Sequence, residues 1–310
     1  KRCFLLPENE KFFGNVSILD IRLSDEFLST QASAFHLVEL SLIKQIYKPR
    51  KKFAHKGTYG HALIIAGEKG KMGAAVLCAD ACVKTGAGLV SVIIPKDQFA
   101  IMQIALPEAM AMAHQEMETL DWAKYSTIAI GPGIGNKNEG ARLVKKVLTT
   151  FTEPMVIDAD GLNILAGQPE LLDYLPAGSI LCPHLKEFEG LFGKSNDHLK
   201  RIQTALKFAR DLSIYIIIKG HYSVLASPDG SVHFNSTGNP GMATGGSGDV
   251  LTGILAGLLS QKYASKDACL LGMFLHGLSA DIAVRTLSEE ALTAGDIVDH
   301  LGKAYLHVRS

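Results

Sequence analysis

The sequence predicts an α/β protein with a mainly parallel sheet between two layers of helices. From about residue 60 onward, short apolar runs alternate with segments of helical character. The runs are apolar along their whole length, which is typical of parallel strands that are covered on both faces. A strand, a helix and a strand in this order imply right-handed crossovers, and therefore a three-layer α/β/α sandwich.

Six apolar runs are expected to form the parallel strands: HALIIAG, GLVSVIIP, STIAIGPG, PMVIDADG, GSILCPH and IYIIIKG. A further segment over 221–235, HYSVLASPDGSVHFN, has two β-rich runs around the turn signal SPDG. It predicts a hairpin at the edge of the sheet. Helices are expected between the strands and again after the last strand, over 74–85, 139–150, 186–193, 198–212, 248–261, 266–286 and 293–307.

Composition excludes several classes of protein. The 310 residues are 47% hydrophobic, and 31 basic side chains balance 31 acidic ones, so no nucleic-acid partner is expected. No apolar run reaches the roughly 20 residues of a membrane-spanning helix, and the start, KRCFLLPENE, is not a secretory signal. Five cysteines without a C-x-x-C pair argue against a disulfide framework or a zinc site. We expect a cytoplasmic protein without a membrane partner.

Two strand-to-helix turns are rich in glycine. The segment IGPGIG over 130–135 follows a strand directly, and its glycines would let a phosphate or a ribose lie against backbone N–H groups. Because position 136 is asparagine, it is not a G-x-G-x-x-G motif, and a plain tight turn is the alternative. The segment GEKGKMG over 67–73 is not a P-loop. Its glycines still open a helix, so a backbone contact to a ligand is possible at Gly73 and Ala74.

The strongest signal is NPGMATGGSGDVLTGILAGLL over 239–259, a glycine-rich loop that runs into an apolar helix. The loop places free N–H groups and the positive end of the helix dipole at Gly246, Ser247 and Gly248, where an anion would bind. Asp249 then lies beside a bound phosphoryl group, as a base that deprotonates an attacking hydroxyl would. The alternative is an ordinary acidic residue at a helix N-terminus.

These residues carry a resemblance. NPGMATGGSGDVLTG is similar to the anion-hole-and-base segment of the ribokinase-like superfamily, and residues 54–307 resemble the NAD(P)H-hydrate dehydratases. The supporting segments are HKGTYGHALIIAG, GKMGAAVLCADACVKTGAGLVSV, AIGPGIG, VIDADGLNIL, LCPHLKEFEGLFG, IIIKGHYSVLASPDG and HGLSADIAV. The resemblance implies a ribokinase-like α/β/α fold without a separate lid domain.

The resemblance also implies an activity. ADP, or ATP in eukaryotic relatives, would phosphorylate the C6 hydroxyl of the S epimer of hydrated NADH or NADPH, with Mg²⁺ as cofactor. Phosphate would then leave and restore the reduced cofactor. Asp249 would be the base, and the N–H groups of Gly246, Ser247 and Gly248 would stabilise the transferred phosphoryl group. The nucleotide would be held by Gly248 and by the loop Lys219, Gly220, His221, Tyr222 and Ser223.

The hydrated cofactor would contact seven residues by the same resemblance: Ala74, Gly133, Gly135, Asp160, Asn163, His184 and Asp249. Glu187 keeps an acidic position that helps to organise magnesium in superfamily kinases. Lys186 departs from the family, which commonly has glycine there. Two alternatives remain open, since Lys219 could cap a strand and His184 could be a satisfied turn histidine. Relatives form tetramers, so a homo-oligomer is expected.

Two other functions remain open at this point. A small-molecule kinase of the same superfamily, acting on a vitamin precursor or a sugar, would use the same Asp249 and the same anion cradle. A non-catalytic nucleotide sensor is the second alternative, although it would have no use for a base at Asp249. The contacts at His184 and IGPGIG favour the hydrate as substrate.

The first fifty residues lack the alternation of strands and helices. The segment CFLLPENEKFFGNVSILDIRLSDEF resembles the last part of an epimerase domain that many bacteria fuse ahead of the dehydratase. We therefore expect residues 1–30 to be the tail of that domain, 31–53 a linker, and 54–310 the dehydratase domain. Because the chain begins at lysine, the natural protein is expected to have roughly 200 more residues upstream. An ordinary N-terminal extension is the alternative.

Overall fold

A single mixed sheet forms the centre of the protein. The computed structural model describes residues 1–310 except 1, 15, 18, 20, 32 and 137. In the described part, ten strands hydrogen-bond in the order β1-β10-β9-β8-β7-β6-β5-β2-β3-β4. The strands are β1 (Phe35–Val38), β2 (His61–Ile65), β3 (Leu89–Ile94), β4 (Met110–Ala113), β5 (Thr127–Ile130), β6 (Val156–Ile157), β7 (Ile180–Leu181), β8 (Tyr215–Ile218), β9 (Val224–Ala226) and β10 (Val232–Asn235).

The sheet is parallel except at β9, which runs antiparallel to both β8 and β10. The expected hairpin therefore forms, but its predicted place at the edge is wrong, because β1 pairs in parallel with β10 and becomes the outer strand. Residues 31–53, expected to be a linker, thus include a strand of the sheet. The short β1 escapes sequence reasoning because only Val38 among its four residues is buried.

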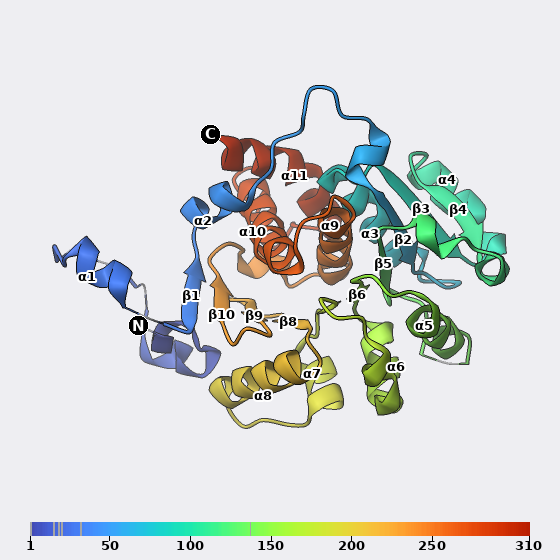
Figure 1. Ribbon diagram of the computed structural model, residues 1–310. Helices are drawn as coiled ribbons and strands as arrows, with labels where there is room; N and C mark the ends of the chain where they lie inside the picture. The colour runs from blue at the N-terminus through green and yellow to red at the C-terminus, as the bar shows by residue number, and fades with distance from the viewer. Residues whose placement is uncertain (1, 15, 18, 20, 32, 137) are drawn as a thin grey trace.

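Helices cover both faces of the sheet, as Figure 1 shows. The helices are α1 (Asp25–Thr30), α2 (Leu40–Ile46), α3 (Met72–Thr85), α4 (Phe99–Ala105), α5 (Asn138–Thr150), α6 (Asp160–Gly167), α7 (Leu185–Phe192), α8 (His198–Asp211), α9 (Ser247–Ser260), α10 (Ser265–Ala283) and α11 (Ala294–Arg309). Alternate side chains of β2 enter two separate hydrophobic cores: Ile64 packs with α3, α9, α10 and α11, and Leu63 packs with α5–α8. This is the three-layer α/β/α arrangement that the alternating pattern predicts.

The helices predicted from 74–85 onward form within three residues of their expected ends. The sequence reasoning missed α4 and β4, which follow β3 along the chain, and α6, which follows β6. It also missed α1 and α2 in the first fifty residues. In the part of the chain that is described, no helix is both long and apolar enough to cross a lipid bilayer.

Helix α9 lies unusually close to α3, and its glycines allow this. A Cβ atom at Gly253 would meet the carbonyl oxygen of Cys78 and lie 2.8 Å from Ala81 Cβ. One turn later, a Cβ atom at Gly257 would lie 2.8 Å from Thr85 Cβ. The two helix backbones therefore touch through glycine, and this contact fixes where the N-terminus of α9 lies over the sheet.

Replacing Gly253 by alanine tests this contact. We expect the free energy of unfolding to fall by about 1–3 kcal/mol, the usual cost of overpacking. Gly302→Ala in α11 is the matched control, because nothing lies within 4 Å of the added Cβ atom. There, the better helix propensity of alanine should raise the stability by up to about 1 kcal/mol. Urea denaturation measures both changes, and equal effects at the two positions would contradict the close contact.

Candidate active site

A cavity of about 420 Å³ opens at the carboxyl ends of the parallel strands. Its walls come from the segments that follow β2, β5, β6 and β7, and from the start of α9. Ligands of open α/β sheets bind at this edge. The lining residues are Gly70, Lys71, Gly73, Ala74, Gly133, Ala159, Asp160, Asn163, Glu187 and Asp249.

Four helices place their first turns at this cavity: α3, α6, α7 and α9. The N-cap residues of α3, α6 and α9 are Lys71, Ala159 and Gly246, and none of their side chains caps the helix. The first N–H groups of these three helices therefore lack a side-chain acceptor at the cap, and the helix dipoles add positive potential. The cavity is suited to an anionic ligand such as a phosphate.

Backbone geometry at two of these helix starts restricts the sequence. Gly246 has φ 91°, and a Cβ atom there would lie 2.5 Å from Leu77 Cδ1 and 3.1 Å from Ala294 Cβ. Only glycine fits this left-handed conformation in so little space. Ala159 has φ 49°, although it is not glycine. Such strained residues cluster at functional sites.

Asp249 lies in the first turn of α9 and lines the cavity. Burial, and then the negative charge of Asp158, raise the pKa of Asp249 to about 7, although the positive charge of Lys219 opposes the shift. A base with a pKa near the working pH is present in its ionised form and still takes up a proton readily. Asp249 is therefore placed and tuned to accept a proton from a hydroxyl group.

Beneath Asp249 lies a buried network that sequence reasoning missed. The carboxylate of Asp158, only 1% exposed, accepts hydrogen bonds from Lys219 Nζ at 2.6 Å, Thr252 Oγ1 at 2.8 Å and the N–H of Ala159 at 2.8 Å. Lys219 Nζ also lies 3.7 Å from Glu187 Oε2. The signal was present in DADG, where Asp158 comes two residues before the expected Asp160.

Five of the seven residues expected to contact the hydrated cofactor line the cavity together: Ala74, Gly133, Asp160, Asn163 and Asp249. The other two do not line it. The N–H of Gly135 donates to Asp160 Oδ2 at 2.9 Å, so Gly135 supports a lining residue. The imidazole of His184 caps α7, because its Nδ1 accepts the N–H of Glu187 at 3.1 Å. This is the satisfied turn histidine that the sequence left as an alternative.

The five residues of the expected nucleotide loop differ in burial and in their contacts. Lys219 points into the Asp158 network, whereas Gly220 and His221 are exposed. Ser223 Oγ donates to the carbonyl oxygen of Gly220 at 3.2 Å, and the rings of His221 and Tyr222 meet edge to face. None of the five residues of this loop lines the cavity.

Ser247, the first residue of α9, is buried and lies beside a histidine. Its Oγ is 3.3 Å from Nε2 of His276, and burial lowers the pKa of this imidazole to about 4. His276 is therefore neutral at pH 7. It contacts the first residue of α9 without adding a charge near Gly248 and Asp249.

Glu187 was expected to help hold magnesium. Its Oε2 accepts the N–H of His184 at 2.7 Å, and its Oε1 lies 3.4 Å from His184 Nε2. No group of three or more His, Cys, Asp and Glu side chains that could hold a metal ion occurs in the described ranges. Magnesium binds through one or two carboxylates when phosphates supply other ligands. Among the residues that the structure describes there is no dedicated metal cage, and we assign none of them as a metal ligand.

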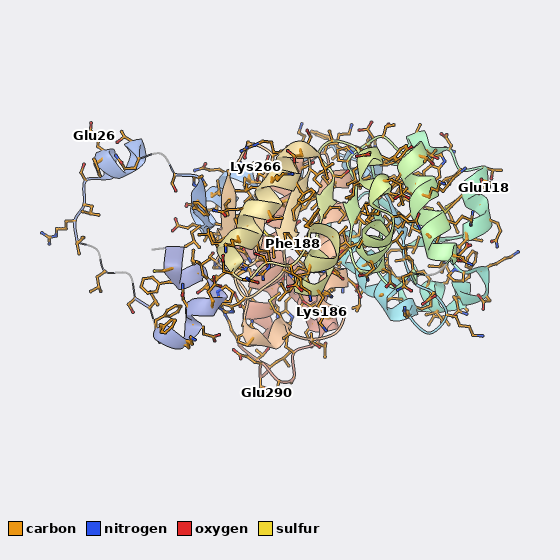
Figure 2. All side chains as sticks on the ribbon, turned by 90° about the horizontal axis from the view of Figure 1, so that it is seen from below. Glu26, Glu118, Lys186, Phe188, Lys266 and Glu290 are labelled. Carbon is orange, nitrogen blue, oxygen red and sulfur yellow. The ribbon has the colours of Figure 1, made fainter. Side chains whose placement is uncertain are left out.

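Two side chains of α7 labelled in Figure 2 have opposite environments. Phe188 is completely buried, whereas Lys186 is exposed. Lys186 is also absent from the cavity lining. The departure at this position from the glycine common in relatives therefore leaves the cavity unobstructed.

The fold is ribokinase-like. A ribokinase-like superfamily protein of Enterococcus faecalis V583 superposes with a TM-score of 0.79 at 23% identity, over 90% of this chain and 98% of that one. Residues 62–303 match the family model described as NAD(P)H-hydrate dehydratase. The chain belongs to the NAD(P)H-hydrate dehydratase family.

Named relatives agree with this assignment. The ADP-dependent (S)-NAD(P)H-hydrate dehydratase of Neisseria meningitidis is 35% identical over 81% of this chain and 87% of its own length. The bifunctional NAD(P)H-hydrate repair enzyme of Moorella thermoacetica is 36% identical over 93% of this chain, which spans 57% of that relative. The ADP/ATP-dependent NAD(P)H-hydrate dehydratase of Bacillus subtilis, co-crystallised with ATP/Mg²⁺, superposes with a TM-score of 0.79 at 29% identity, over 88% of this chain and 98% of that one.

The raised pKa of Asp249 predicts how Asp249→Asn changes stability with pH. Folded Asp249 keeps its proton up to about pH 7, whereas in the unfolded chain this side chain has the ordinary aspartate pKa of 3.8. Stability from this group therefore falls as the pH rises from about 4 to 7, and is level above 7. Asparagine does not titrate. The variant should gain stability relative to the wild type across that range in thermal melts, and a constant difference from pH 5 to 8 would contradict the assignment.

Proposed function

We propose that this chain dehydrates the S epimer of hydrated NADH or NADPH and converts ADP to AMP and phosphate. The observation that carries the proposal is Asp249, which faces the cavity from the uncapped N-terminus of α9. Family membership supplies the substrate class. The whole natural protein's activity is part of the same proposal, because this chain spans only 57% of the Moorella thermoacetica relative.

The first step transfers a phosphoryl group. Asp249 accepts the proton of the C6 hydroxyl, whose oxygen attacks the terminal phosphorus of ADP. The bond from that phosphorus to the bridging oxygen breaks, and AMP leaves with the electron pair. The N–H groups of Gly246, Ser247 and Gly248 donate to the phosphoryl oxygens, where negative charge must be stabilised in the transition state.

The second step is an elimination. Hydroxide is a poor leaving group, whereas phosphate leaves readily. The bond from C6 to oxygen breaks, and the lone pair of the ring nitrogen supports the positive charge at C6. A proton then leaves C5, and the double bond between C5 and C6 restores NADH or NADPH. Phosphorylation by ADP thus drives the removal of water from a stable hydrate.

The two anionic ligands would bind at different places. The lining of the cavity by Ala74, Gly133, Asp160 and Asn163 supports binding of the hydrated cofactor next to Asp249. We assign the nucleotide to Gly248 and to the loop from Gly220 to Ser223, in which Gly220 and His221 are exposed. Magnesium would be carried by the nucleotide's phosphates and would neutralise part of their charge. The co-crystallisation of the Bacillus subtilis enzyme with ATP/Mg²⁺ supports this. The tetramer and the cytoplasmic location stay predictions.

The deciding experiment mixes the purified protein with NADH hydrate, magnesium, and ADP or ATP. Absorbance near 340 nm should return as NADH forms. Asp249→Asn should lower turnover by roughly 10²–10⁴-fold, the range for loss of a general base, while nucleotide affinity should change little because the backbone donors remain. Phosphorylation of a sugar or a vitamin precursor without any NADH formation would replace the proposal by a kinase. Nucleotide binding without any turnover would replace it by a sensor.

We also propose that residues 1–30 continue an epimerase-type domain upstream, as the resemblance of this segment implies. Many large apolar side chains of this segment are exposed, including Phe12, Leu19, Ile21 and Phe27. Limited proteolysis with mass spectrometry should remove this segment first. Because β1 pairs with β10, cleavage should stop before Phe35 instead of reaching residue 50. The remaining core should stay folded and active, and loss of activity with the first cut would contradict this boundary.

A further inference from the structure

The buried pair of Asp158 and Lys219 has no direct part in the proposed reaction. Asp158 follows β6 and Lys219 follows β8, so the two come from different strands of the sheet. Their side chains meet at 2.6 Å, and they are 1% and 20% exposed. A buried ion pair does not as a rule add stability over apolar residues of the same size. Stability alone therefore does not account for this ion pair.

The pair is attached to α9 on both sides of Asp249. Thr252 Oγ1 donates to Asp158 Oδ2 at 2.8 Å. A Cβ atom at Gly248 would lie 3.3 Å from Lys219 Nζ and 3.6 Å from Asp158 Oδ2. Residues three apart on a helix are neighbours on one face, so Thr252 adjoins Asp249 and Gly248 directly precedes it. The ion pair thus packs against the turn that carries Asp249.

From this geometry we propose that Asp158 and Lys219 are positioning residues, which hold the first turn of α9 and set the pH at which Asp249 acts as a base. The inference rests on the proposed role of Asp249. It also reassigns Lys219, which the sequence placed with the nucleotide. If Lys219 turned toward a phosphate, Asp158 would be left as a buried, unpaired charge, at a large energetic cost.

The charges around Asp249 have opposite effects on its pKa. Asp158, Asp160 and Glu187 favour its protonated form, and Lys219 favours its ionised form. The thiol of Cys78, on the neighbouring α3, stays neutral because burial raises its pKa well above the usual value. Lys219 is itself charged, since the attraction of Asp158 and Glu187 outweighs the burial that would lower its pKa. Removing the charge of Lys219 should therefore raise the pKa of Asp249, and removing the charge of Asp158 should lower it.

The test is the pH profile of kcat/KM for the hydrate in three variants. Lys219→Met should move the rising limb to higher pH. At pH 7, kcat/KM should fall by about tenfold for each pH unit of displacement. At high pH, kcat/KM should recover. Asp158→Asn should move the limb to lower pH. Lys219→Arg keeps the charge and should leave the limb where it is in the wild type. The KM for ADP should change less than about threefold in each variant, because no phosphate contact is removed.

A second readout does not need activity. The stability difference between a protein and its Asp249→Asn derivative should level off near pH 7 in the wild type, at higher pH with Lys219→Met and at lower pH with Asp158→Asn. If the wild type fails to dehydrate the hydrate but these midpoints move as stated, the proposed function fails and the positioning role stands. Should Lys219→Met not fold, Asp158→Asn carries the test, because Lys219 then still has Glu187 nearby.

The opposite pattern overturns the inference. A Lys219→Met enzyme with a KM for ADP raised about tenfold or more, and an unchanged pH profile, would make Lys219 a nucleotide ligand. The inference also fails if the stability difference levels off at the wild-type pH in both Lys219→Met and Asp158→Asn. The pair would then have no influence on the pKa of Asp249.

Discussion

The carboxylate of Asp158 links the segments that form the site. It receives hydrogen bonds from Lys219 after β8, from Thr252 on α9 and from the N–H that precedes α6. Through Lys219 it also reaches Glu187 at the start of α7. Four segments that are far apart in the sequence are therefore fixed relative to one another by a group that is almost completely buried. A charge in such surroundings is tolerated because both carboxylate oxygens accept hydrogen bonds, one of them from the Lys219 ammonium group.

The close packing of α9 against α3 also positions the site. Because Gly253 and Gly257 lack side chains, α9 touches the backbone of α3, and the two helices present their N-termini to the same cavity. The uncapped N–H groups and the helix dipoles supply positive potential without a mobile cation. Asp249 is then the acidic group in the first turn of a helix whose terminus is suited to bind an anion. This combination of a base and an anion site is what phosphoryl transfer to a hydroxyl requires.

The same architecture explains why Asp249 differs from an ordinary acidic residue at a helix N-terminus. Such a residue is usually solvated and ionised at low pH. Here, burial and Asp158 raise the pKa of Asp249 to about 7, with Lys219 opposing them. The pKa of Asp249 is therefore a property of the assembled network and not of its own helix.

The sequence by itself determined the α/β/α class, the seven helices that it predicted, within three residues of their ends, and the glycine-rich helix start at 246–249. These depend on local periodicity and on glycine at a helix start, which neighbouring residues encode. Only the tertiary structure decided that β1 is the outer strand, that Lys219 turns toward Asp158 and that His184 caps α7. Partners of a buried charge or of an edge strand come from distant parts of the chain, and no local pattern records which of them the fold brings together.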